Sequence, residues 1–266
     1  MQEMTFNTYR PDGKIKIYSI PVMLILGSAF GIASAGIIHL IWVYTNFYLM
    51  LFFPALIGLT TGFGLKLGVK TSKARNIIIG VIISIITGLI AYSSMHIFDA
   101  LRTGLKLNQM DIYLEITSTE IGYNIRDIEI KGIGVWIIWS IELLIVIILS
   151  LILTIKQIIK PFNSNCDKWC YRYKTFNISK EYKDDIIKAV TNNDFETIEK
   201  ILFSEFEGTE KDYLTVNFYY AENCYDIGYL TIKERISKDK KNYTEVTLVK
   251  NLIIDDSVTV KKIIDV

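Results

Sequence analysis

The chain has 266 residues, 51% of them hydrophobic, and a formal net charge of +1. This length is sufficient for a helical membrane bundle and one small soluble domain. The balanced charge excludes the strongly basic surface that is typical of nucleic-acid-binding proteins, so we predict no nucleic-acid partner.

The charged residues are distributed very unevenly along the chain. Residues 17–65 and 76–98 contain no Asp, Glu, Lys or Arg, and residues 132–155 contain only Glu142. Helices and strands on the surface of a soluble domain need a polar face. The pattern therefore indicates an integral membrane protein, and the lipid bilayer is one predicted partner.

The apolar stretches predict four transmembrane helices. A crossing takes about 20 apolar residues, and helices satisfy their own backbone polar groups in lipid. Tyr44-Thr45-Asn46 divides the first stretch, so the predicted spans are about 21–43, 47–68, 76–98 and 133–156. With an outer loop at 99–132, they form a membrane domain at 1–160. Small residues four positions apart, such as Gly27 and Gly31, predict close helix packing, within the chain or with another copy.

The basic residues predict the orientation of the bundle. They cluster before the first span, between the second and third, and after the fourth, whereas loop 99–132 has four basic residues against six acidic ones. By the positive-inside rule, both termini lie in the cytosol. Lys14 and Lys16 followed by an apolar run and Ala33-Ser34-Ala35 also resemble a signal peptide, but the apolar run continues past that point, as a span does.

Three ionisable residues fall within the predicted spans, all toward the outer side: His39, His96 and Glu142. A carboxylate in lipid must be protonated, paired or hydrated. Either the three form a site that binds a cation or passes protons, or Glu142 is neutral and hydrogen-bonded while the histidines lie at the headgroups. The outer loop is too long for a turn, and its amphipathic part is expected to cap the bundle or lie on the membrane.

Residues 161–266 read as a small cytosolic α+β domain. Helices are predicted at about 179–191 and 194–204, with Ser179 and Asp194 as N-caps, and strands at about 212–220, 227–234 and 243–254. A short helix or strand closes the chain. The overall fold class is thus a four-helix membrane bundle followed by an α+β domain.

The three cysteines all lie in this cytosolic part, where thiols stay reduced. Cys166, Cys170 and Cys224 are weak candidates for a metal site, because the region has no histidine and no fourth cysteine. Asp167 or Asp226 would have to complete such a site. We therefore favour ordinary thiols and predict neither a metal nor a cofactor.

Several segments together resemble an uncharacterised family of bacterial four-transmembrane-helix membrane proteins with no assigned activity. The resemblance rests on Tyr9-Arg10-Pro11-Asp12-Gly13-Lys14, Phe47-Tyr48-Leu49, Gly62-Phe63-Gly64, Lys73-Ala74-Arg75-Asn76, Gly134-Val135-Trp136 with Trp139 and Glu142, and Pro161-Phe162 to Cys166-Asp167-Lys168-Trp169. It implies the same architecture and a bacterial cytoplasmic membrane. Members of that family often carry two C-x-x-C pairs in the tail, and Asn163 and Ala221 stand here in place of the first cysteines.

The functional prediction is an interaction or assembly component, not an enzyme. The chain has no phosphate-binding loop, no H-E-x-x-H and no G-x-S-x-G. We expect the cytosolic domain to bind a protein partner or another copy of the chain. The alternative is a small transporter or channel-like protein that uses Glu142 with His39 or His96.

Overall fold

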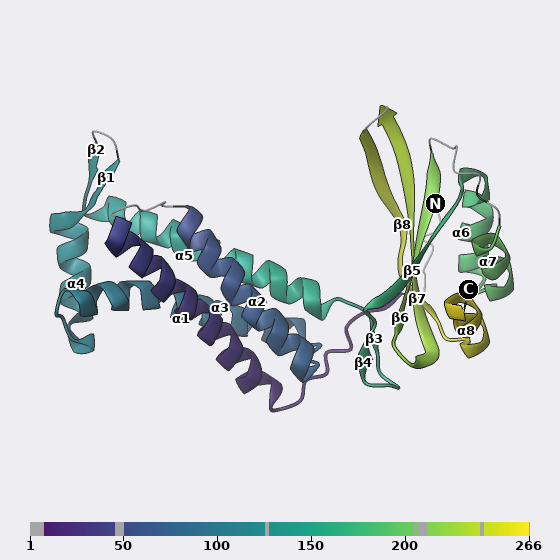
Figure 1. Cartoon of the computed structure of the whole chain (residues 1–266), viewed down its shortest axis with the longest axis horizontal. Coiled ribbons are helices and arrows are strands. Elements are labelled where there is room, and N and C mark those ends of the chain that lie inside the picture. Colours follow the sequence, from purple (N-terminus) through teal and green to yellow (C-terminus); the bar gives the residue numbers. More distant parts are fainter. Residues whose placement is uncertain are drawn as a thin grey trace. The chain divides into compact units, whose positions relative to one another are not determined.

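The computed structural model describes residues 8–45, 51–125, 128–204, 206, 212–239 and 242–265. They divide into two compact units (Figure 1). The helical unit is Asp12–Ile159, and the second unit combines the residues before Asp12 with Lys160 and all that follows.

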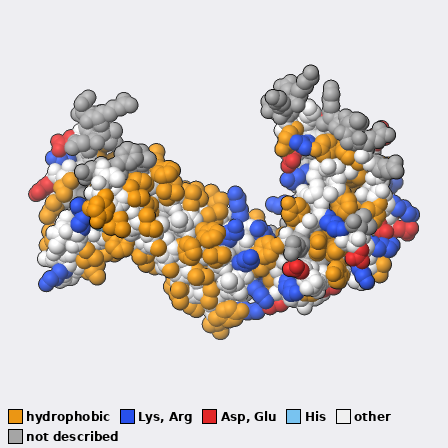
Figure 2. Space-filling model, viewed as in Figure 1, with side chains coloured by type: hydrophobic (Ala, Val, Ile, Leu, Met, Phe, Trp, Pro, Cys, Tyr) orange, Lys and Arg blue, Asp and Glu red, His pale blue; other side chains and the backbone are white. Residues whose placement is uncertain are grey.

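Four helices form the helical unit: α1 (Ser19–Thr45), α2 (Phe52–Ser72), α3 (Ile77–Arg102) and α5 (Ile133–Ile158). Each is long and apolar enough to cross a membrane, as predicted, and hydrophobic side chains cover the side of the bundle in Figure 2. Helix α2 extends past the predicted end at 68, to Ser72, where Lys73 adopts the left-handed conformation (φ 57°) that closes a helix. Its predicted start at 47 lies outside the described residues.

The helices pack as a ring in which α1 and α5 each contact both α2 and α3. Glycines allow this close approach. A Cβ added to Gly64 would lie 2.5 Å from the carbonyl oxygen of Leu26, and one added to Gly58 would lie 2.8 Å from that of Val146. The regularly spaced glycines therefore allow close contacts between helices of the same chain.

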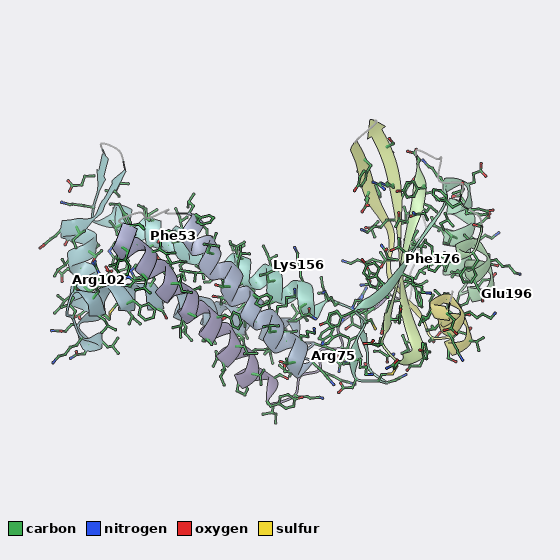
Figure 3. The ribbon with its side chains drawn as sticks, in the orientation of Figure 1. Phe53, Arg75, Arg102, Lys156, Phe176 and Glu196 are labelled. Atoms are coloured by element: carbon green, nitrogen blue, oxygen red, sulfur yellow. A yellow bond between two sulfur atoms is a disulfide. The ribbon has the colours of Figure 1, made fainter. Side chains whose placement is uncertain are left out.

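A cap covers one end of the bundle, where α4 and the β1–β2 hairpin lie in Figure 1. We define the cap as residues 107–130: η1 (Leu107–Gln109), α4 (Met110–Ile116), the π-helical turn η2 (Thr117–Ile121), β1 (Tyr123–Ile125) and β2 (Ile128–Ile130). The helix fits the capping role considered for this loop, whereas the hairpin was not predicted, because its strands are three residues each. Figure 3 shows Arg102 at this end, and Arg75 and Lys156 at the opposite, basic end.

The second unit is built on an antiparallel four-stranded sheet in the order β5-β6-β7-β8. Its strands are β5 (Arg172–Ser179), β6 (Tyr213–Ala221), β7 (Cys224–Asp239) and β8 (Asn242–Ile254), preceded by a short hairpin of β3 (Phe162–Asn163) and β4 (Lys168–Trp169). The three predicted strands are present and β7 is longer than expected. Strand β5 was not predicted.

Helices cover one face of this sheet: η3 (Lys180–Tyr182), α6 (Lys183–Thr191), α7 (Phe195–Leu202) and α8 (Ser257–Asp265). Ser179 and Asp194 act as the predicted N-caps, accepting hydrogen bonds from the backbone N–H of Glu181 and of Thr197. Alternate residues of the strands, including Leu214, Phe218 and Ile232, form the core beneath the helices. The closing segment is a helix.

The N-terminal segment joins the second unit rather than the bundle. Thr8 forms a β-bridge with Leu252, and the backbone N–H of Tyr9 donates to the carbonyl of Asn251 at 2.8 Å. The rings of Tyr9 and Tyr229 meet edge to face, 5.4 Å apart. The sequence predicts a domain boundary at 160; the compact units of the structure divide between Ile159 and Lys160, and residues 8–11 lie with the unit that follows.

Candidate functional site

The strongest candidate site lies in the cap half of the bundle, around Glu142. This residue of α5 is fully buried, and the hydroxyl of Tyr92 on α3 donates a hydrogen bond of 2.8 Å to its carboxylate. Tyr92 is itself 6% exposed. Helix α3 thus presents its single phenol, that of Tyr92, to the only acidic residue of α5.

His96 joins this cluster and His39 does not contact it. The ring of His96 lies 5.0 Å from that of Tyr92 and 4.9 Å from that of Trp139, measured between centroids. Tyr92 and His96 are four residues apart on α3, and Trp139 and Glu142 three apart on α5, so each pair shares a helix face. His39 instead packs beside Trp42 and Phe98, and its Nδ1 is buried with no hydrogen-bond partner among the described residues.

The cap is attached to this cluster through two tyrosines. Tyr113 of α4 donates to the carboxylate of Asp99 at 2.8 Å, and Asp99 also pairs with Arg102 at 3.1 Å. Tyr123 of β1 accepts a hydrogen bond of 3.0 Å from the indole N–H of Trp139.

Burial raises the pKa of both cap tyrosines. The charge of Asp99 raises that of Tyr113 further, and the charge of Glu142 adds to the effect on Tyr123. Both phenols therefore stay protonated at physiological pH and act as hydrogen-bonding groups.

Sequence reasoning found Glu142 and His96 but missed Asp99 and the three tyrosines. The spacing of Tyr92 to His96 was a usable signal, since residues four apart on a helix lie on one face. Tyr113 and Tyr123 gave no such signal, because only the fold of the cap brings them to the bundle.

The cysteines of the second unit form a different cluster. Cys166, in the β3–β4 hairpin, and Cys224, at the start of β7, form a disulfide, which differs from the expectation of reduced thiols. Asp226 lies beside them, its carboxylate 2.8 Å from Cys224 Sγ and 3.5 Å from Cys166 Sγ. The two sulfur atoms and a carboxylate oxygen lie within 4.8 Å of one another, a spacing suited to a metal ion. Sulfur atoms joined in a disulfide are not the thiolates that bind metal.

Cys170 packs beside Cys224, but its Sγ is not among the three grouped ligand atoms. It is a buried free thiol, and burial raises its pKa to about 12. A thiol with so high a pKa is a poor ligand and a poor nucleophile. Of the three weak metal candidates, the structure thus brings together Cys166 and Cys224 and adds Asp226.

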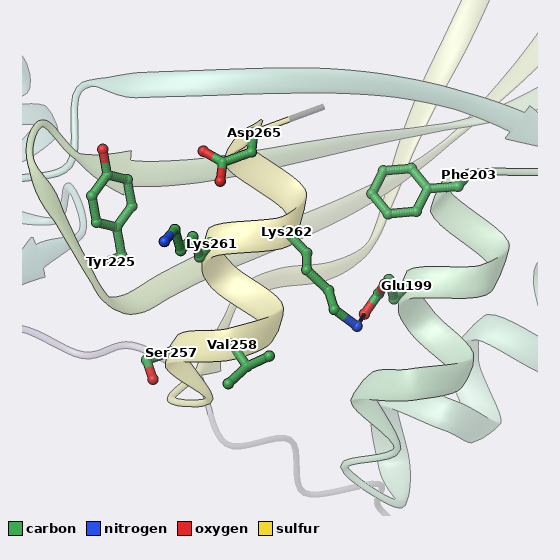
Figure 4. Close-up of a pocket in the computed structure, with 8 residues that line it drawn as sticks. All are labelled: Glu199, Phe203, Tyr225, Ser257, Val258, Lys261, Lys262 and Asp265. Atoms are coloured by element: carbon green, nitrogen blue, oxygen red, sulfur yellow. Dashed lines mark hydrogen bonds and ion pairs between the residues drawn. The ribbon is translucent and has the colours of Figure 1, made fainter.

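The second unit also has a shallow groove between α7 and α8 (Figure 4). Phe203, Tyr225 and Val258 supply its apolar part, and Lys262 pairs with Glu199 at 3.2 Å. Ser257, Lys261 and Asp265 supply the rest of its polar lining.

In the described residues no helix covers the sheet face opposite α6, α7 and α8, although Tyr9 packs on Tyr229 at one end of it. Toward the opposite end the guanidinium of Arg235 lies between two rings, 3.4 Å from the centroid of Tyr243 and 5.3 Å from that of Tyr213. We call this surface the open face; by register and burial it comprises Tyr173, Thr175, Asn177, Tyr213, Thr215, Asn217, Lys233, Arg235, Tyr243, Glu245 and Thr247.

The fold and these sites together define a chain with four helices able to span a membrane and a separate antiparallel α+β unit. Comparison with protein-family models, with curated proteins and with solved structures finds no match for it. The functional argument therefore rests on the chain's own residues.

Proposed function

We propose that this protein is a membrane-anchored assembly component whose α+β domain binds a protein partner through the open face. One observation carries the proposal: the helices cover one side of the sheet and leave Tyr173 and Tyr243 61% and 51% exposed on the other. Tyr and Arg are enriched at protein interfaces, and Tyr gives a large contact area at low entropic cost.

We also propose how the bundle is oriented in the membrane. Lys66, Lys70, Lys73 and Lys156 lie at the basic end, which favours the cytosol for that end and for both termini. The inclusion of residues 8–11 in the second unit supports having both ends on one side. The Cys166–Cys224 disulfide favours an oxidising compartment instead. We give the charges more weight, since basic residues flanking the spans act directly on helix orientation. A bacterial cytoplasmic membrane is the location that we propose.

The proposed interface can be tested in intact membranes. A photo-crosslinking amino acid at Tyr173 or Thr247 should give one discrete adduct, while the same group at Lys188, on the exposed side of α6, should give none. Arg235→Ala should abolish the adduct without loss of the membrane-inserted chain.

Two results would count against the proposal. Equal adducts from Lys188 and Tyr173 would show that the open face has no special role. A C-terminal reporter that is active only outside the cytosol would reverse the orientation, and with it the compartment of the partner.

A further inference from the structure

Glu142 lies where an ionised carboxylate is energetically unfavourable. It is fully buried on α5, and the neighbouring cluster is formed largely by apolar groups, including Phe53 and Ile57 of α2. Burying a charge in such surroundings costs several kcal/mol or more unless the group is paired or takes up a proton. The bundle nevertheless holds this carboxyl group in a defined position, against the hydroxyl of Tyr92.

Polar groups lead from Glu142 toward the cap. After Tyr92 comes His96, which is half-buried and whose ring lies 6.3 Å from that of Tyr113. Tyr113 bonds to Asp99, and Asp99 pairs with Arg102, whose side chain is 48% exposed. Phenol, imidazole and carboxylate groups are the ones that exchange protons in proteins.

Among the described residues, no comparable series of titratable side chains leads from Glu142 toward the basic end. Val146, Ile57 and Ala91 are each 0% exposed and form a layer there whose polar member is Thr61, and the Thr61 hydroxyl donates to the carbonyl of Ile57 at 2.7 Å. The next hydroxyl group on α5 is that of Ser150, eight residues and thus about 12 Å further along the helix. Hydroxyl groups beyond this layer bond to one another or to the backbone, as in the 3.1 Å bond from Ser84 to Thr154.

We infer that Glu142 is a proton-binding site that exchanges with the cap side of the membrane and is closed to the basic side. The reaction is the uptake of one proton by the carboxylate, with Tyr92 as the adjoining hydroxyl. The titratable groups around it are Tyr92, His96 and Asp99 of α3 and Tyr123 of β1, with His39 of α1 further off. Helix α2 contributes Phe53, Leu56 and Ile57 to the apolar cluster beside it.

This assignment goes beyond the assembly role and is independent of the open face. It also differs from transport, because among the described residues no titratable side chain continues the series from Glu142 toward the basic end. The site would bind a proton in response to the pH on one side of the membrane.

The test uses the full chain in right-side-out and inverted native membrane vesicles. The probe is dicyclohexylcarbodiimide, an apolar reagent that modifies protonated carboxyl groups within membranes, and the adduct on Glu142 is measured by peptide mass spectrometry. We expect acidification of the cap side alone to raise modification, by up to about tenfold per pH unit while the group is mostly ionised. Acidification of the basic side alone should leave it unchanged.

Infrared spectroscopy of the reconstituted protein supplies a second measurement. Of the carbonyl bands of protonated carboxyl groups that grow on acidification, one component should be missing in Glu142→Gln. Glu115→Gln, at an exposed position of α4, is the matched control and should retain the band. Modification that follows the pH of the basic side, or a band and adduct that do not change with pH, would overturn the inference.

Discussion

Glu234 illustrates how a single residue of the α+β unit combines burial and charge. It is 5% exposed, on the face of β7 beneath the helices, and receives Lys183 Nζ at 2.7 Å and Lys180 Nζ at 3.2 Å. The hydrogen bond from Lys183 is the main cause that lowers the pKa of this carboxyl group below its ordinary value of 4.5; burial opposes the effect and Lys180 adds to it. These pairs link α6 and the turn before it to the sheet.

The lowered pKa gives a prediction with a definite sign. The folded state binds the Glu234 proton less tightly than the unfolded state, so the stabilisation is present above the ordinary pKa and is lost as the pH falls through the folded pKa. Glu234→Gln should cost about 1–3 kcal/mol near neutral pH and should weaken the acid dependence of stability.

Hydrogen exchange of β7 and α6 in the full chain would measure this effect. Glu245→Gln is the matched control, because Glu245 forms a pair with Lys233 in which both side chains are more than one-third exposed. Exposed pairs contribute little. An equal loss of protection in the two variants would contradict the role assigned to Glu234.

At the scale of elements, glycine contacts decide how α1 and α2 meet. Gly68 approaches Met23, where an added Cβ would be 2.7 Å from its Cα, and Gly64 approaches Leu26 in the same way. The obstructing atoms belong to the backbone, which cannot move aside as a flexible side chain can. Close contact between the two helices therefore depends on the absence of side chains at these positions.

Gly64→Ala should consequently destabilise the bundle by about 1–3 kcal/mol, the usual cost of overpacking. Gly36→Ala provides the control, since its new Cβ would meet Phe98 at 3.4 Å, an ordinary contact distance. Unfolding of the full chain in mixed micelles, followed by circular dichroism, should separate the two variants. Comparable stability of both would show that the helices can move apart without cost.

Local sequence patterns located most elements and failed at identifiable ones. The four bundle helices follow from long apolar runs, and α6 and α7 from their caps, because these signals depend on neighbours along the chain. Strand β5 was missed. Phe176 and Ile178 are its only residues in the core, and most of its other residues are polar, so the sequence shows no clear alternation of apolar and polar side chains. The β1–β2 and β3–β4 hairpins are too short to produce a period at all.

At the scale of the whole molecule, residues 8–11 belong to the same compact unit as the segment after Lys160. Thr8 and Tyr9 pack on β8 and Tyr229, although the helical unit separates them in sequence from these partners. The segment covers part of the β8 edge, which an exposed strand would otherwise offer to other chains.

Removal of the Tyr9 side chain should therefore destabilise the α+β unit and not the bundle. We expect Tyr9→Ala to cost about 1–3 kcal/mol, from lost apolar burial and the lost ring contact. Faster hydrogen exchange in β8, with unchanged exchange in α1, would confirm this. Tyr18→Ala is the control, at a position that is 50% exposed. Loss of protection in α1 instead would place the N-terminal segment with the bundle.

The sequence by itself determined the number of apolar helices, their approximate ends, the boundary near residue 160 and the presence of two helices and three strands beyond it. These are properties of neighbouring residues: hydrophobic length, period and caps. Only the tertiary structure decided that Tyr92 meets Glu142, that Cys166 meets Cys224 and that Tyr9 meets Tyr229. Those contacts join residues that are far apart along the chain. They depend on how the elements pack against one another, which no local pattern encodes.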